Sequence, residues 1–317
     1  NFNLYYSRYA LDNDRLCMRF DSDIRSANPN KLYYGLKELA IKADKLDDLL
    51  VQEFAALQTV DTEHIIEIPE AEKEVKYRFM ISWIKDTLDY ISSLDADKFS
   101  GGIAYLLLSL AFRIDYLLCP DGKLLNELEK IVDIYFRKDE KQTQERNQGM
   151  IEGFRKMAEK TKEEVFPFLF RSKHTFAIVA PQQHKAVADA IQGAAQNLAW
   201  YRDNNYPIIA NKVVEYGLSF SQYSYSLPKP LSELFLLFMQ VNYRDYFEAL
   251  GFTVPYYDAA GNRFDPGAIR ERIEEITGAW IAKYPKLLFR MEMLQFNNLV
   301  SFNTSFANEI AELNFDA

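Results

Sequence analysis

Glycine and proline are scarce in this chain, which has 12 of the first and 11 of the second among its 317 residues. All-β proteins need many tight turns built from these two residues, whereas the interior of a helix disfavours both. The scarcity therefore predicts a mainly α fold, a multi-helix bundle or array of about 9–11 helices joined by short β-hairpin or extended connectors.

Cysteine and histidine are also rare, and their rarity excludes several chemistries. Cys17 and Cys119 lie far apart and form no C-x-x-C motif, so no disulfide framework is expected. We expect reduced thiols and a cytoplasmic location, with a processed secreted chain as the alternative. The sequence holds no Glu-x-x-His pair, no phosphate-binding loop and no hydrolase motif. It therefore predicts no catalytic residue, no cofactor and no metal site.

One candidate polar site involves the histidines. His64 and His174 each precede a run rich in β-branched residues. Pairing of these two runs would bring the imidazoles together beside Glu63 or Glu67 and allow acid–base chemistry or metal binding. The alternative is two surface or structural histidines.

A surplus of positive charge is missing as well. The chain has 37 Lys and Arg against 46 Asp and Glu, which gives a net charge of −9. Nucleic-acid binding relies on clustered basic residues, so no nucleic-acid partner is expected, and a basic protein would suit the charge better. The most apolar run, residues 101–112, ends at Arg113, short of the roughly 20 residues of a membrane span. We therefore expect a buried core helix there and no membrane span.

Apolar residues recur at helical spacing in residues 32–57 and form one continuous stripe. The steps along it are three or four residues, close to a heptad pattern. This stripe predicts a long helix that either pairs with another helix of the same chain or mediates homo-oligomerisation. Its members are Leu32, Leu36, Leu39, Ala43, Leu46, Leu50, Phe54 and Leu57.

A charged stretch of mixed sign, residues 138–164, divides the sequence. Its first part, residues 138–148, is expected to be a hinge, and its second part an exposed amphipathic helix. Two helical subdomains are therefore expected, residues 1–148 and residues 149–317, which can also pack as one unit.

Local signals predict several helix ends. Helices are expected to begin at Pro207 and at Pro266, the second capped by Asp265, and one is expected to end at Gly251. A last helix is expected from Pro285 to about Leu313.

Three short extended pieces are predicted near residues 64–68, 174–180 and 252–264. The last of these contains Ala260-Gly261-Asn262, a turn signal, and predicts a β-hairpin. Tyrosine is favoured at protein interfaces. We therefore expect a contact surface on this hairpin and on the Tyr-rich segment 223–227, with these candidate residues: Tyr223, Tyr225, Tyr256, Tyr257, Asn262, Arg263 and Phe264.

An acidic helical scaffold without a catalytic constellation leads to two functional hypotheses. The first is a non-enzymatic protein-binding module, such as an adaptor, a chaperone-like factor or a toxin-neutralising partner. The second is a helical enzyme or small-ligand-binding protein with a pocket between its two halves. A deep enclosed cavity in which His64 and His174 converge would favour the second hypothesis, and a flat or grooved aromatic patch without an enclosed cavity would favour the first.

Overall fold

A computed structural model describes residues 4–60, 62–173 and 182–316. In this part of the chain it has thirteen α-helices and three two-stranded antiparallel sheets, which confirms the mainly α prediction. The strands are β1 (Ser7–Asp12), β2 (Arg15–Phe20), β3 (Ile65–Glu67), β4 (Phe170–Ser172), β5 (Tyr257–Asp258) and β6 (Arg263–Phe264). The helices are α1 (Pro29–Glu53), α2 (Glu70–Ser92), α3 (Ser100–Leu118), α4 (Gly122–Phe136), α5 (Thr143–Ala158), α6 (Lys162–Val165), α7 (His184–Ala195), α8 (Leu198–Asp203), α9 (Pro207–Ser224), α10 (Lys229–Asn242), α11 (Arg244–Ala249), α12 (Pro266–Trp280) and α13 (Leu299–Ala311).

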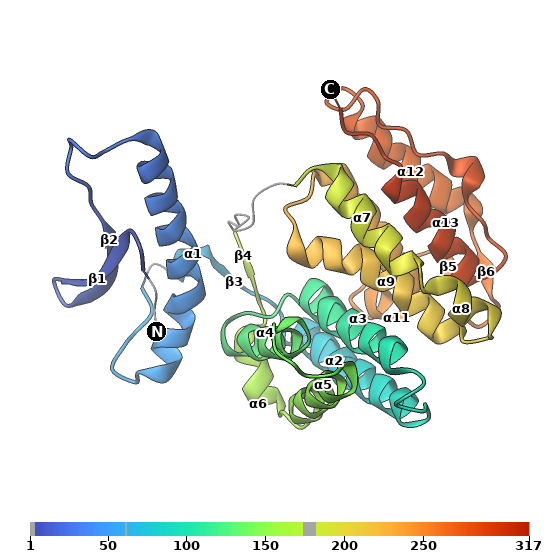
Figure 1. The fold of residues 1–317 in the computed structure, drawn as a ribbon, viewed down its shortest axis with the longest axis horizontal. Coiled ribbons are helices and arrows are strands. Elements are labelled where there is room, and N and C mark those ends of the chain that lie inside the picture. Colours follow the sequence, from blue (N-terminus) through green and yellow to red (C-terminus); the bar gives the residue numbers. More distant parts are fainter. Residues whose placement is uncertain (1–3, 61, 174–181, 317) are drawn as a thin grey trace.

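The chain is divided into a large helical body and an N-terminal arm. Helices α2 to α13 pack together, whereas β1, β2 and α1 stand to one side (Figure 1). We use "arm" for residues 4–60. Strand β3, which follows the arm, pairs with β4, with Ile65 opposite Ser172. This short sheet joins the base of the arm to the body.

Helix α3 is the centre of the body. Its sequence is apolar on all sides, as expected of a helix surrounded by others, and Leu107, Leu110 and Ile114 have no exposed surface. It packs along α9 and also contacts α2, α4 and α5. Within the described residues, α3 is the one helix whose length and composition would allow it to cross a membrane. However, 78% of that apolar window is buried inside the protein, as in a core helix.

Helices α7 and α9 approach closely because small residues line their contact. A Cβ added to Gly217 of α9 would lie 3.1 Å from the Cα of Ile191 and 3.4 Å from the Cβ of Ala194, both in α7. The Ala-rich composition of α7 therefore serves close helix packing. Helix α13 covers the other side of this pair.

Local signals set most helix ends where the sequence predicts them. The side chain of Asp265 accepts a hydrogen bond from the Ala268 N–H and caps α12 directly before Pro266. Gly251, at φ +88°, follows α11 in the left-handed region that favours glycine.

Two segments differ from expectation. Residues 138–148 do not form a hinge throughout, since α5 begins at Thr143 with a capping box between Gln142 and Glu145. The helix expected from Pro285 to Leu313 begins only at Leu299. Residues 285–298 instead run largely without α-helix and bury Leu287 and Phe289 in the core.

The predicted boundary at residue 148 falls inside α5, which packs against α2, α3 and α4. The division into two subdomains stays a prediction.

Candidate functional site

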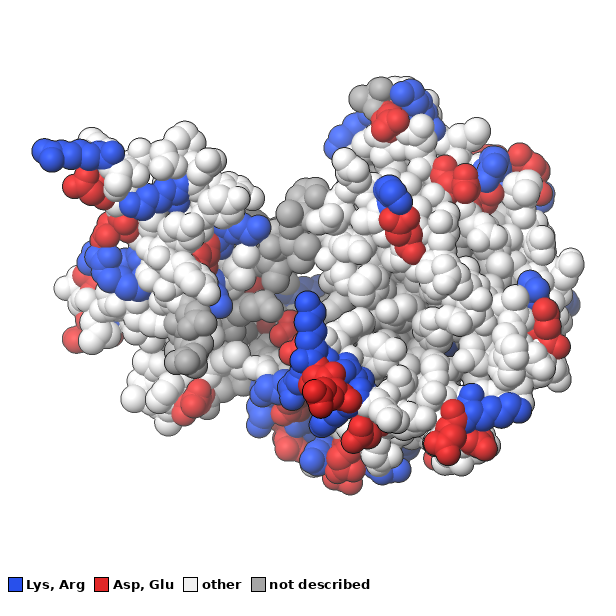
Figure 2. All heavy atoms as spheres, viewed as in Figure 1, with Lys and Arg blue, Asp and Glu red and all other residues white. Residues whose placement is uncertain are grey.

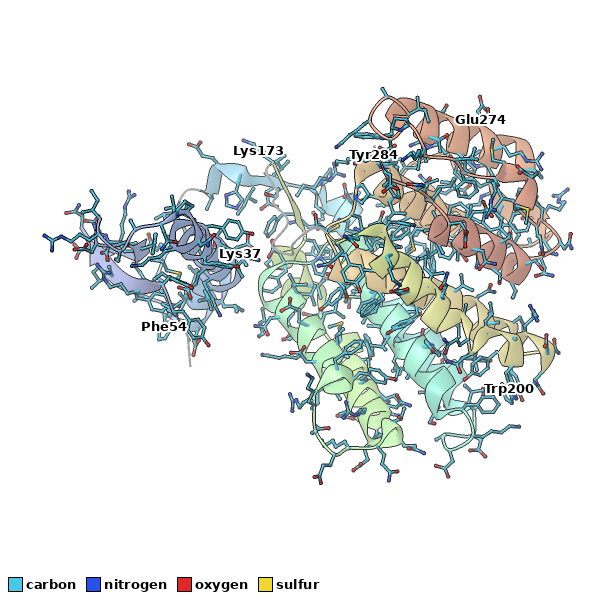
Figure 3. The ribbon with its side chains drawn as sticks, turned by 45° about the horizontal axis from the view of Figure 1, so that its top comes forward. Lys37, Phe54, Lys173, Trp200, Glu274 and Tyr284 are labelled. Atoms are coloured by element: carbon cyan, nitrogen blue, oxygen red, sulfur yellow. The ribbon has the colours of Figure 1, made fainter. Side chains whose placement is uncertain are left out.

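The arm contributes nothing to the hydrophobic core of the body. Every described residue of the core cluster, and every partly buried hydrophobic side chain packed against it, comes from residues 68–315. The main neighbour of α1 in the body is α4. Figure 3 shows the arm as a separate layer, with Lys37 on the side of α1 toward the body and Phe54 beyond the end of the helix. Within the described chain, the apolar side chains of the arm therefore stay outside the hydrophobic core.

The β1–β2 hairpin folds against one face of α1. Its turn residues, Asn13 and Asp14, both have positive φ, 49° and 62°, as a two-residue hairpin turn requires. At the other end of the hairpin, a Cβ on Gly35 would come within 2.6 Å of the Phe20 ring, so glycine is needed for this contact. The hairpin therefore packs at a defined position on α1.

Glu38 of α1 holds the N-terminal segment. Its carboxylate accepts hydrogen bonds from the backbone N–H groups of Tyr5 (2.6 Å), Tyr6 (2.9 Å) and Ser7 (2.7 Å) and from the Ser7 hydroxyl (2.6 Å). Burial alone would raise the pKa of Glu38, but these donors outweigh it and lower the pKa to about 2. The ionised carboxylate is thus the form that anchors the segment.

Large hydrophobic side chains are exposed on the arm far more than elsewhere. In the described part of the chain, 10 of the 19 exposed large hydrophobic residues lie within residues 5–54. The exposed fraction reaches 76% at Leu11 and 88% at Ile24. On α1 it is 53% at both Leu32 and Leu36, the first members of the predicted stripe. Most of the exposed large hydrophobic side chains of the described chain are therefore gathered on the arm.

The Tyr-rich segment 223–227 lies at the end of α9 and its side chains turn inward. Tyr223 stacks on Phe112 of α3 with ring centroids 4.6 Å apart, and Tyr225 packs edge-on against Phe220. Both rings are half-buried against the core.

The hairpin at residues 256–264 forms as β5 and β6, with Tyr257 opposite Phe264. Tyr257 is buried, and its ring lies 4.4 Å from that of Phe264, while Tyr256 is half-buried. Asn262 and Arg263 are exposed, and Arg263 pairs with Asp258 at 3.0 Å. Of the predicted contact residues, these last two present their side chains to solvent, and the contact role of the hairpin stays a prediction.

The structure describes only one of the two histidines of the predicted polar site. His64 is exposed and ends a short 3₁₀ helix (Thr62–His64), and its carbonyl accepts a hydrogen bond from the Lys173 N–H at 2.8 Å. His174 and the run that follows it lie outside the described residues. Among the residues that are described, no group of three or more His, Cys, Asp and Glu is placed to hold a metal ion.

A buried ionic cluster, which the sequence reasoning missed, joins four parts of the body. Lys212 and Glu215 of α9 pair at 2.5 Å, and both also contact the Tyr243 hydroxyl, to which Arg113 of α3 donates at 3.0 Å. The Arg113 guanidinium lies between two rings, 4.9 Å from that of Trp83 and 4.8 Å from that of Tyr243.

Burial and the neighbouring positive charge of Arg113 lower the pKa of Lys212 to about 8. Arg113 and Glu215 are only 4% and 1% exposed, so a substrate would reach them only if the body opened. One nitrogen of Arg113 (Nε) and one oxygen of Glu215 (Oε1) have no hydrogen-bond partner within the described structure. The cluster therefore has the geometry of an internal brace more than of a catalytic site.

A tyrosine-lined cavity lies between α3, α4 and the α7–α9 region. Its volume is about 260 Å³, and its residues come from both halves of the sequence. Asn197 donates to the Tyr105 hydroxyl at 3.0 Å at its wall. The lining residues are Gly101, Ala104, Tyr105, Leu108, Tyr135, Asn197, Tyr201 and Tyr216. The lining carries no ionised group.

Comparison with models of protein families, with curated proteins and with solved structures gives no match to this chain. Its function is therefore argued from its own residues.

Proposed function

We propose that this chain is a non-enzymatic protein-binding module, of the adaptor, chaperone-like or toxin-neutralising kind, and that the arm is its binding element. The observation that carries the proposal is the concentration of exposed hydrophobic side chains on residues 5–54, none of which enters the core. Loops and appendages presented by a rigid scaffold commonly carry binding. Here the helical body is the scaffold and the arm is the appendage.

The distribution of charge between the arm and the body indicates a second property of the partner. The arm, taken as residues 1–60, has 8 Lys and Arg and 9 Asp and Glu, so 8 − 9 = −1, and the remaining −8 of the net charge lies in the body. Figure 2 shows acidic and basic side chains interspersed on the face it draws, without a large patch of one sign. We propose apolar docking on the arm, with the acidic body favouring a basic partner through long-range attraction.

The free state of both cysteines fits a reducing compartment, and we propose that the protein acts in the cytoplasm.

Affinity capture from the native host tests the proposal. The bait proteins are the wild type, an arm variant with Leu11→Ser, Leu16→Ser and Ile24→Ser, and the matched control Leu288→Ser. Leu288 is 70% exposed on the body, so the control removes an equally exposed apolar side chain outside the arm. We expect one protein to be retained by the wild type and the control and to be lost by the arm variant. Equal retention by all three baits would contradict the proposal.

The second candidate function is binding of a small ligand in the tyrosine-lined cavity. Four phenol rings and one amide around about 260 Å³ suit a small, flat, uncharged molecule with hydrogen-bond acceptors. Native mass spectrometry of protein purified from its host tests this candidate. A bound small molecule that is lost in Ala104→Leu, which fills part of the cavity, would favour it over the first, whereas an unliganded mass in the wild type would exclude it.

A further inference from the structure

Helix α1 is a long amphipathic helix with little packing against the other described residues of its chain. Of its 25 residues, Gly35 is the only buried one among those whose burial is described. Most of the stability of a helix in a protein comes from packing of its apolar face. A two-stranded hairpin such as β1–β2 is itself only marginally stable and cannot replace that packing. The stripe on α1 therefore needs a partner surface.

The stripe has the pattern of a coiled-coil seam. With Leu36 at heptad position a, the a positions are Leu36, Ala43 and Leu50, and the d positions are Leu32, Leu39 and Leu46. All six are apolar over nearly three heptads, and leucine at every d position is typical of parallel two-stranded coils. A surface with this pattern is complementary to another copy of itself.

The flanking positions favour a parallel arrangement. In a parallel pair, each g residue faces the e residue five positions later in the other copy. Lys42 at g would then face Asp47 at e of the second copy. In an antiparallel pair, Lys42 of one copy would lie near Lys42 of the other. Charge therefore selects the parallel direction.

The seam is accessible in the folded chain. The hairpin occupies the face of Gly35 and Glu38, to one side of the stripe. Lys37, at heptad position b, lies on the side of α1 toward the body (Figure 3). Of the six seam residues, Leu32, Leu36 and Ala43 are exposed, whereas Leu39, Leu46 and Leu50 are half-buried.

From these observations we infer that α1 pairs with α1 of a second copy of this chain as a parallel two-stranded coiled coil. This inference rests on the proposed role of the arm as a binding element and assigns its helix to a second copy, while the exposed hairpin side chains remain for the host partner. The near-neutral arm places little repulsion across such a seam, whereas two acidic bodies repel and are kept on the outside.

Light scattering after gel filtration, over a range of concentrations, measures the assembly. We expect the wild type to have twice the 36.9 kDa mass of the chain and Leu36→Glu/Leu46→Glu to have the single mass. The control is Leu11→Glu, which adds one such carboxylate on the hairpin, away from the seam, and should stay dimeric. Circular dichroism of each variant verifies that the helical body is intact.

Cysteine cross-linking tests the direction. In a background with Cys17→Ser and Cys119→Ser, Leu36→Cys places one thiol at an a position, where two parallel copies bring their Cα atoms within disulfide distance. We expect rapid cross-linking of Leu36→Cys under mild oxidation. We expect none of Ile41→Cys, because residue 41 is at heptad position f, on the side of α1 away from the seam. A monomeric wild type, or a dimer that survives Leu36→Glu/Leu46→Glu, would overturn the inference. A dimer without the Leu36→Cys cross-link would overturn the parallel direction.

The host capture experiment separates this inference from the proposed function. A monomeric chain whose arm still captures a different protein would remove the coiled coil and leave the binding role of the arm intact.

Discussion

At the level of single residues, the burial of charged groups is the main contribution that opposes folding. Glu215 and Arg113 are held away from water, Lys212 is half-buried beside them, and their mutual contacts through Tyr243 offset the loss of hydration. The charged groups of this network stabilise each other. Removal of one group therefore leaves a buried charge without its partner. The cluster should therefore respond more strongly to a single substitution than to a paired one.

Lys212→Met should lower the free energy of unfolding by about 3 kcal/mol at neutral pH, because it leaves the Glu215 carboxylate buried without its cation. Lys212→Met/Glu215→Gln should lose less than the single variant, since no unpaired carboxylate remains. Urea denaturation provides the measurement. The control is Lys185→Met, which breaks the solvent-exposed pair with Asp189 and should change stability by no more than about 0.5 kcal/mol. Equal losses in Lys212→Met and Lys185→Met would show that burial does not matter here.

Helix packing can be tested with two glycines that differ in their surroundings. Gly217→Ala should destabilise the body by about 1–3 kcal/mol, because its new methyl group would press on the backbone of α7. Gly193, in α7, has no atom within 4 Å of an added Cβ. Gly193→Ala should therefore stabilise the protein by up to about 1 kcal/mol through helix propensity. Thermal unfolding of both variants measures the contrast, which would be absent if α7 and α9 did not pack as described.

At the level of elements, the arm is held together by few interactions, and the Glu38 carboxylate makes several of them. Its folded-state pKa is lowered from 4.5 to about 2, so its stabilising effect is complete above 4.5 and is lost as the pH falls toward 2. The hairpin and the N-terminal segment should therefore loosen from α1 in acid before the body unfolds.

Amide hydrogen exchange at Tyr5, Tyr6 and Ser7 measures this release. We expect protection of the three amides to decrease as the pH falls below about 4.5, after correction for the pH dependence of intrinsic exchange. Glu38→Gln should lose the protection at neutral pH, and Glu53→Gln, at the end of the same helix, should retain it. Protection that is unchanged in Glu38→Gln would contradict the anchoring role.

The sequence predicts elements best where one local pattern decides them. The apolar run of α3 and the prolines that begin α9 and α12 gave correct helices. The stripe of residues 32–57 predicted α1, but its last members, Phe54 and Leu57, lie beyond the end of the helix at Glu53. The β1–β2 hairpin was missed, although Asn13-Asp14 between two runs of alternating pattern is a hairpin signal. The helix expected from residue 285 was too long, and the alternation of buried Leu287 and Phe289 indicated extended chain.

The candidate sites could be predicted less well, because they depend on distant contacts. Tyr223 and Tyr257 have the composition of an interface, yet their rings pack on Phe112 and Phe264. Arg113, Lys212 and Tyr243 are far apart in sequence, and no local pattern brings them together. The stripe of α1 was visible in the sequence, but the absence of a covering helix among the described residues is a property of the fold.

At the level of the whole molecule, body and arm should be energetically separate. The three tryptophans, Trp83, Trp200 and Trp280, all lie in the body, so their fluorescence reports on the body alone. This separation permits a direct test.

Leu36→Glu should leave the tryptophan-detected free energy of unfolding within about 0.5 kcal/mol of the wild type, since Leu36 lies outside the core. Leu107→Ala, in the middle of α3, should lower it by about 2–5 kcal/mol through loss of buried volume. Urea denaturation followed by tryptophan emission makes the comparison. A large loss in Leu36→Glu would mean that the arm and body unfold as one unit.

The short β3–β4 sheet has a consequence for the order of events during synthesis. Residues 65–67 of β3 find their partner only when residues 170–172 of β4 have been made. Until then the arm, which precedes the body on the ribosome, lacks this connection and has α4 as its main neighbour among the described elements of the body. Neighbouring nascent chains on one message would thus present their arms to each other before either body is finished, and pairing of subunits could precede completion of the fold.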